Sequence, residues 1–300
     1  MTRRNQRRSR GAFQNGSFAM RIDVVDEVVS TRRFYGSASS CPVNSPAVAR
    51  RDDRDLLGTV WGWIVIATTT VVFGTLALLT SWVPPRGRLF LFWARAWSRA
   101  LLVLCGIPSR IELSAAAAEI PQAVFMSNHE SLVDIPLLFV GIRQDVRFLA
   151  KRILFFVPFL GWSMGAAGFV PVDRRRTEKA ADVFLTLEKR VKAGNSILVF
   201  PEGTRSRSGA LQPFKRSGFL LALRTGLPIV PVAVSGARNV VGADSLWIRR
   251  VPVVIRFGEP IRTAGMTLSD QKALMERVRA VILRLRLPGP PVSAGGSDHG

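Results

Sequence analysis

The sequence predicts an α/β protein: a mainly parallel, mixed sheet flanked by helices, preceded by a membrane-associated helical segment near the N-terminus. Short apolar runs typical of strands follow one another from Arg110 onward, and segments with helical periodicity separate several of them. Strands that alternate with helices favour a mainly parallel sheet with helices on its faces. Before these runs, the stretch from Leu56 to Pro85 carries no charged residue.

Residues 1–54 are rich in Arg, Ser, Gly and Asn and show little hydrophobic periodicity, which predicts a disordered basic arm. The first apolar stretch begins too far from Met1 for a cleaved signal peptide. That stretch, from Leu56 to Pro85, is longer than the roughly 20 apolar residues that cross a bilayer as a helix. A buried helix of a soluble protein is the alternative, but such helices rarely run this long without a charge.

Residues 86–107 mix Trp and Phe with several arginines, a composition typical of a helix that lies at a membrane interface. We therefore expect membrane-embedded or interfacial helices over residues 55–107. Arginines flank the apolar stretch on both sides, so the positive-inside rule gives no clear orientation for a single span. We favour a re-entrant hairpin that keeps both ends on the cytoplasmic side.

A globular α/β domain is expected over residues 108–287, followed by a flexible tail over residues 288–300. The predicted strands are 110–113, 123–127, 146–150, 168–172, 196–200, 229–235 and 253–258. The predicted helices are 131–141, 175–193, 213–225 and 267–287.

The formal net charge of +21 indicates an anionic partner, which is nucleic acid, anionic lipid or a phosphorylated substrate. Binding to single-stranded nucleic acid needs basic residues interleaved with exposed aromatics, yet the aromatics here gather near the apolar segment, so nucleic acid is not an expected partner. Cys41 and Cys105 lack metal-ligand spacing, so neither a zinc site nor a disulfide framework is expected.

The stretch "MSNHESLVDIP" contains His129, and Asp134 follows five residues later, just after a predicted strand where a helix should begin. A neutral imidazole can take a proton from an alcohol, and a carboxylate on its other nitrogen fixes the tautomer. A spacing of five does not bring two side chains together on a regular helix, so the pair needs a turn between them. The alternative is a capped helix start with Asp134 in solvent.

A second polar segment, "FPEGTRS", follows the predicted strand that ends at Phe200. Gly203 permits close backbone approach, Thr204 offers a hydroxyl, and Arg205 offers a fork that matches phosphate. The glycine spacing and lysine of a Walker loop are absent. In a third segment, "FVPVDR", Arg174 closely follows a strand, with Asp173 before it.

These segments, taken in order, resemble the motifs of the 1-acylglycerol-3-phosphate O-acyltransferase (lysophosphatidate acyltransferase, PlsC-like) family. "NHESLVD" fits the first block, NHxSxxD; "FVPVDR", "FPEGTRS" and "LPIVPVAVSG" are similar to the second, third and fourth. The resemblance spans about Pro108 to Pro260 and implies the glycerolipid acyltransferase fold. The arginine-rich arm has no counterpart in the pattern.

The resemblance implies a role for each matching residue. His129 would be the general base on a glycerol hydroxyl, and Asp134 would orient it. The acceptor phosphate would be held by Arg174, Glu202, Gly203, Thr204 and Arg205. Asn128, Ser131 and Lys151 would assist, with Ser131 more a capping or orienting residue than a nucleophile. No metal and no cofactor are expected, because a thiolate is a good leaving group.

The implied reaction moves a fatty acyl group from acyl-CoA or acyl carrier protein to the sn-2 hydroxyl of lysophosphatidate, which gives phosphatidate for phospholipid biosynthesis. The alternative acceptor is another lysolipid, a lyso-ornithine lipid or a lysophosphodiester. A serine hydrolase using Ser131 or Ser206 is a further alternative, but the chain lacks a GxSxG elbow. The expected partners are membrane phospholipids, the lysophospholipid and the thioester donor. The expected location is the cytoplasmic face of a bacterial inner membrane.

Overall fold

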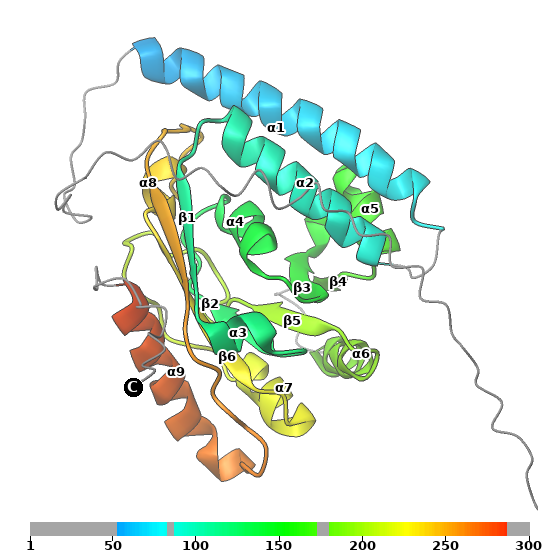
Figure 1. Ribbon diagram of the computed structural model, residues 1–300, viewed down its shortest axis with the longest axis vertical. Helices are drawn as coiled ribbons and strands as arrows, with labels where there is room; N and C mark the ends of the chain where they lie inside the picture. The colour runs from blue at the N-terminus through cyan, green and yellow to red at the C-terminus, as the bar shows by residue number, and fades with distance from the viewer. Residues whose placement is uncertain (1–52, 83–86, 173–179, 287–300) are drawn as a thin grey trace, which may run out of the picture. The chain divides into compact units, whose positions relative to one another are not determined.

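The computed structural model describes residues 53–82, 87–172 and 180–286, all of which lie in one unit, Ala47–Gly300 (Figure 1). The helices are α1 (Asp53–Leu79), α2 (Arg88–Leu104), α3 (Ala115–Glu119), α4 (Asp134–Gly141), α5 (Leu160–Ala166), α6 (Ala180–Lys192), α7 (Ser217–Thr225), α8 (Ala237–Val240) and α9 (Gln271–Arg286), with the 3-10 turns η3 (Arg152–Phe156) and η5 (Leu268–Asp270). The strands are β1 (Ser109–Leu113), β2 (Val124–Ser127), β3 (Val146–Lys151), β4 (Val170–Val172), β5 (Ser196–Val199), β6 (Ile229–Ser235) and β7 (Val253–Phe257).

The strands form one mixed sheet in the order β1-β7-β6-β2-β5-β3-β4. Every neighbouring pair is parallel except β6 and β7, which confirms the predicted mainly parallel sheet. Strands β2 and β5 lie side by side, with Met126 opposite Val199, so the loops that follow them leave the sheet at the same edge. Ligands of open α/β sheets usually bind outside such carboxyl ends.

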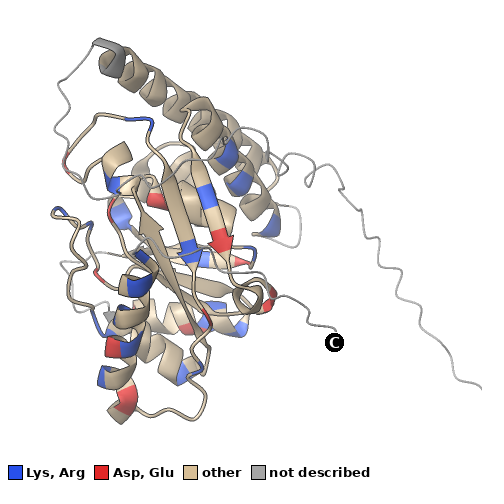
Figure 2. Ribbon diagram, turned by 60° about the vertical axis from the view of Figure 1, so that its left-hand side comes forward, with Lys and Arg blue, Asp and Glu red and all other residues tan. Residues whose placement is uncertain are grey.

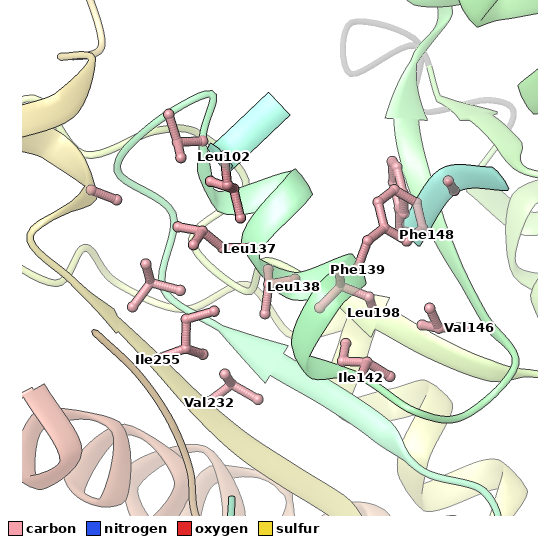
Figure 3. Packing of buried hydrophobic residues seen from close by; sticks show 14 of the residues in the cluster. Leu102, Leu137, Leu138, Phe139, Ile142, Val146, Phe148, Leu198, Val232 and Ile255 are labelled. Atoms are coloured by element: carbon pink, nitrogen blue, oxygen red, sulfur yellow. The ribbon is translucent and has the colours of Figure 1, made fainter. Parts of the chain in front are cut away.

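Two hydrophobic clusters cover the two faces of the sheet, because successive side chains of a strand point to opposite faces. On β2, Phe125 belongs to one cluster, while Val124 and Met126 belong to the other. Helices α2 and α4 complete the first cluster; Figure 3 shows Leu137 and Leu138 of α4 between Leu102 of α2 and the strands. Helices α6, α7 and α9 complete the second.

Helices α1 and α2 pack against each other as an antiparallel pair. The indole N–H of Trp61, early in α1, donates to the carbonyl of Leu104 at the end of α2. The indole N–H of Trp93 in α2 donates to the hydroxyl of Thr80, just after the end of α1. Leu56–Leu79 is the one helical stretch among the described residues that is long and apolar enough to cross a membrane, and its ribbon in Figure 2 has no segment in the colours of Lys, Arg, Asp or Glu.

Several predicted boundaries shift, and some fall outside the described residues. Helix α1 begins at Asp53, inside the segment expected to be a disordered arm. The rest of that arm and the tail expected over 288–300 lie outside the described residues, as do residues 175–179 of a predicted helix. The helix predicted over 267–287 is divided into η5 and α9, because Thr267 and Asp270 form a capping box at the start of η5.

Candidate active site

His129 lies in the loop that connects β2 to α4, residues 128–133, which we call the histidine loop. Its Nδ1 is 2.7 Å from Oδ2 of Asp134, the first residue of α4. The histidine side chain is 14% exposed and the aspartate side chain is fully buried. A carboxylate accepts a hydrogen bond from the N–H at Nδ1, so Nε2 is left as the nitrogen that can take a proton from a substrate.

The turn that the spacing of His129 and Asp134 requires is formed by the histidine loop itself. Oδ2 of Asp134 also accepts the backbone N–H groups of Glu130 at 2.7 Å and Ser131 at 2.9 Å. The hydroxyl of Ser131 donates to the carbonyl of Val241 and accepts from the N–H of Val133. Asp134 therefore fixes both the turn and the orientation of the imidazole ring, and the hydrogen bonds of Ser131 hold the same turn.

Two further contacts fix the position of His129. The amide of buried Asn128 pairs with both the N–H and the carbonyl of Val234, which ties the end of β2 to β6. The imidazole stacks on the ring of Phe200, with centroids 4.1 Å apart and planes 20° apart. Phe200 was not among the predicted site residues; its place at the end of a strand, directly before "PEGTR", is the signal that could have indicated it.

The loop after β5, residues 200–212, which we call the PEGTR loop, is fastened to the histidine loop. Oε1 of buried Glu202 accepts the backbone N–H of His129 at 2.8 Å, and Oε2 accepts that of Gln212 at 2.7 Å. The backbone N–H of Ser206 donates to the carbonyl of His129 at 2.7 Å. Burial raises the pKa of Glu202, and the two N–H donors partly offset this shift.

Glu202 was predicted to hold the acceptor phosphate. Both of its carboxylate oxygens instead accept backbone N–H groups, so its side chain positions the two loops. Gly203 has a φ of +75° in the turn, and its N–H donates to the carbonyl of Phe200. A Cβ at Gly203 would lie 2.9 Å from the Nζ of Lys215, so a side chain there would be both strained and crowded.

A cavity of about 1020 Å³ opens beside the pair of His129 and Asp134, which we call the dyad. This volume lies at the upper end of the range for ligand pockets. The polar part of its wall includes His129, Lys151, Thr204 and Arg205, all of them predicted site residues. Much of the rest is apolar and comes from the helices on the same side of the sheet. That apolar wall includes Trp63, Ile66, Phe73, Phe90, Trp93, Trp97, Phe139, Leu160 and Met164.

Behind the dyad lies an ion pair that the sequence did not indicate. Glu130 is buried, and its Oε1 accepts from Nη2 of Arg286 at 2.5 Å and from the amide of Asn128 at 3.2 Å. The same Nη2 donates to the carbonyl of Gly209 in the PEGTR loop. Burial raises the pKa of Glu130 to about 7, with Arg286 lowering it and Asp134 raising it further. Arg286 ends α9 and had no sequence signal, because 156 residues separate it from Glu130.

The serine hydrolase alternative finds no support in this geometry. Ser131 is buried with its hydroxyl bonded to Val241. Ser206 is buried as well, and its hydroxyl donates to the carbonyl of Ala210. Arg174, predicted to contact the phosphate, lies outside the described residues, as does Asp173.

The chain is similar in sequence to known proteins. The family model described as Acyltransferase matches residues 110–235. Three 1-acyl-sn-glycerol-3-phosphate acyltransferases are similar: one from Cocos nucifera is 32% identical over 67% of this chain and 65% of its own length, and one from Saccharomyces cerevisiae is 32% identical over 62% of each. The third, a chloroplastic protein from Brassica napus, is 38% identical over 41% of this chain and 35% of its own length. The matched region thus spans between about a third and two thirds of these relatives.

A solved structure shares the fold. The crystal structure of the 1-acyl-sn-glycerophosphate acyltransferase PlsC from Thermotoga maritima covers 77% of this chain and 94% of its own, with a TM-score of 0.67 and 24% sequence identity. Residues 110–235 thus match an acyltransferase family model, and the fold is that of a solved acyltransferase. These similarities support the 1-acylglycerol-3-phosphate O-acyltransferase family that the motifs predict.

Proposed function

We propose that the protein is a membrane-bound enzyme that transfers a fatty acyl group from a thioester to the sn-2 hydroxyl of lysophosphatidate and so forms phosphatidate. One observation carries the proposal: His129, held by Asp134, lines the same cavity as Arg205. That wall combines a proton acceptor, a cation suited to phosphate and a large apolar surface suited to acyl chains.

The proposed reaction begins when Nε2 of His129 takes the proton of the sn-2 hydroxyl. The hydroxyl oxygen attacks the thioester carbonyl, and Asp134 stabilises the imidazolium that forms. The tetrahedral intermediate then breaks its carbon–sulfur bond, and the thiolate takes up the proton from the imidazolium. The products are phosphatidate and the free thiol of coenzyme A or of acyl carrier protein, and the imidazole returns to its neutral form.

The acceptor assignment depends on the cations of the cavity. Arg205 and Lys151 both line it, and the guanidinium fork of an arginine matches the oxygens of a phosphomonoester. The exposed apolar surface of α1 supports attachment to the membrane that holds the lysolipid. In this proposal the active site faces the cytoplasm, where the thioester donors occur.

A panel assay tests the proposal. Purified protein in detergent is offered lysophosphatidate, a lysophosphodiester and a lyso-ornithine lipid, each with acyl-CoA and with acyl carrier protein. We expect the highest kcat/KM with lysophosphatidate, and transfer by the His129→Ala variant that is slower by about 100-fold or more. A preference for another lysolipid would replace the acceptor, and transfer by the variant at the wild-type rate would remove His129 as the base.

A further inference from the structure

A group of apolar side chains lies exposed in the segment between β3 and α5, inside the catalytic domain. Phe156 is 67% exposed, Ile153 66% and Trp162 54%, with Val157 and Leu154 also exposed. Single exposed apolar residues are normal on a protein surface, but several together indicate contact with a membrane or another apolar partner. We call residues 152–162 the lip.

The lip has an inner and an outer side. Ile153, Leu154 and Leu160 line the cavity that contains His129, whereas Phe156 and Trp162 are exposed and are not part of its wall. Because Ile153 and Leu154 both line the cavity and are exposed, the lip lies where the cavity meets the surroundings. Whatever the outer side contacts lies directly beside the site.

The lip contacts α1 at a residue with an unusual backbone conformation. Phe159 has a φ of 62°, the only positive φ of a non-glycine residue in the described part of the chain. The N–H of Leu160 donates to the carbonyl of Pro158 at 2.7 Å, which closes a tight turn around Phe159. A Cβ on Gly74 of α1 would lie only 2.9 Å from Cβ of Phe159, so α1 has a glycine where the lip approaches it.

Such strained residues persist only where the surrounding structure holds them, and they gather at functional sites. Here the strained turn keeps the lip against α1, and Figure 1 shows α5, which begins within the lip, beside that helix. The exposed apolar residues of the lip therefore belong to a segment that packs against the helix that is apolar enough to enter a bilayer.

The charge of the segment favours one occupant. Lys151, directly before the lip, and Arg152, its first residue, are both exposed. Basic residues beside Phe and Trp suit an anionic membrane interface, where aromatics lie at headgroup depth and cations lie near phosphates. A protein partner would have to cover the same surface while α1 stays free to enter the bilayer.

We propose that the lip inserts into the interface of an anionic bilayer next to α1, so that a lysolipid passes from the membrane into the cavity without crossing water. The use of this passage by a lysolipid rests on the proposed function, whereas insertion of the lip does not. The catalytic domain thereby contributes a membrane contact of its own, in addition to α1 and α2.

A fluorescent label tests insertion without any assay of activity. The label NBD is attached to a cysteine at position 156 in the full chain with Cys41 changed to Ser; Cys105 is buried and can stay. We expect a blue shift on adding phosphatidylglycerol-containing vesicles, and quenching by lipids brominated on their acyl chains. A label at position 185 is the matched control, since Leu185 is 53% exposed on α6, across the sheet.

Insertion is overturned if a label at Trp61 of α1 shifts with vesicles while the label at position 156 does not. A label at position 156 that shifts only when a second copy of the chain binds would show a protein contact instead. Arg152→Gln should weaken the response about fivefold on anionic vesicles and leave it unchanged on neutral ones.

A kinetic test addresses the passage. Phe156→Ser with Trp162→Ser should lower kcat/KM by about tenfold or more for a lysophosphatidate embedded in vesicles, because two aromatic side chains no longer enter the interface. Activity toward a short-chain, water-soluble lysophosphatidate should not change. The control, Leu185→Ser with Leu268→Ser, removes exposed apolar residues that are not part of the lip and should affect neither substrate.

Equal rates for the lip variant and the wild type on the embedded acceptor would contradict entry of the lysolipid past the lip. No transfer to any lysolipid by the wild type would reject the proposed function, while the NBD result still decides whether the lip inserts.

Discussion

The histidine loop and the PEGTR loop leave the sheet side by side, yet they place their side chains differently. In the histidine loop Asn128, Glu130 and Ser131 are buried and bonded to the protein, and His129 lines the cavity. In the PEGTR loop Glu202 and Ser206 are buried, while the residues that line the cavity include Thr204, Arg205 and Arg207.

This difference separates two tasks. A proton acceptor must hold one geometry, and a histidine loop anchored at nearly every polar atom provides it. A phosphate site can adjust, because several donors can share the oxygens of one anion. Changes in the histidine loop should therefore lower kcat, and changes among the outward residues of the PEGTR loop should raise KM.

Replacement of the base is the largest expected effect. His129→Ala should reduce kcat by about 10²–10⁴-fold, the range for loss of a general base. Thermal unfolding should change little, because the ring makes one hydrogen bond and one stacking contact. His299→Ala, at the other histidine of the chain, is the control and should keep full activity. A kcat within about twofold of the wild type would contradict the assignment of this role.

Removal of the cation from the PEGTR loop comes next. Arg205→Ala should lose a charge-assisted hydrogen bond of about 1.5–3 kcal/mol, which raises the KM for lysophosphatidate roughly ten- to hundredfold. Arg205→Lys should fall in between, since it keeps the charge but loses the fork. Arg216→Ala removes an exposed arginine at the start of α7 and serves as the control. A decrease in kcat with no change in KM would contradict the assignment of substrate binding to the PEGTR loop.

A smaller effect is expected from Arg286, which acts as a positioning residue for both loops. Arg286→Met breaks the bonds to Glu130 and to the carbonyl of Gly209, so kcat should fall by about tenfold with KM nearly constant. Arg286→Lys should restore part of the loss. Arg284→Met, at an exposed position on the same helix, should change neither constant.

Arg286→Met leaves the carboxyl of Glu130 buried without its cation, so this variant is also prone to unfold. The double variant Glu130→Gln, Arg286→Met removes that carboxyl together with the cation. If the double variant folds and has the wild-type kcat, the link to Gly209 has no part in positioning the loops.

Much of this site could be predicted from the sequence, because its signals are local. Strands end in "VFMS" and "SILV", and the polar residues that follow each end carry recognisable chemistry. The spacing of His129 and Asp134 allowed them to pair if a turn separated them, and left a capped helix start with Asp134 in solvent as the alternative. The parallel pairing of β2 and β5 then brought the two segments to one edge.

The remaining contacts depend on tertiary packing and could not be predicted. Whether Glu130 faces solvent or the interior is set by α9, whose last residue lies far along the chain. In the sequence, the lip is one more apolar run. Only the structure shows that Phe156 is exposed while Leu160 lines the cavity. Asn128 fits the motif, but its bonds to Val234 identify it as a clamp between strands.

The smallest expected effect concerns stability and depends on pH. The pKa of Glu130 is raised from an ordinary value of 4.5 to about 7, so the folded state binds this proton more tightly than the unfolded state does. The resulting stabilisation is fully present below pH 4.5 and is lost as the pH rises through 7. Glu130→Gln lacks this titration, so its free energy of unfolding should gain on the wild type by at most about 3 kcal/mol between pH 4.5 and pH 8.

Denaturant unfolding of both proteins at these two pH values measures the difference. The pKa of Glu202 is also raised, and Asp134 and Arg286 lie around Glu130. All three residues are present in both proteins, so their contributions to the pH dependence of unfolding largely cancel. Glu276→Gln, at an exposed position on α9, is the control for removal of a carboxyl. Parallel pH dependences of the two free energies of unfolding would mean that folding does not raise the pKa of Glu130, and protonation of this carboxyl would then contribute nothing to the stability of the histidine loop.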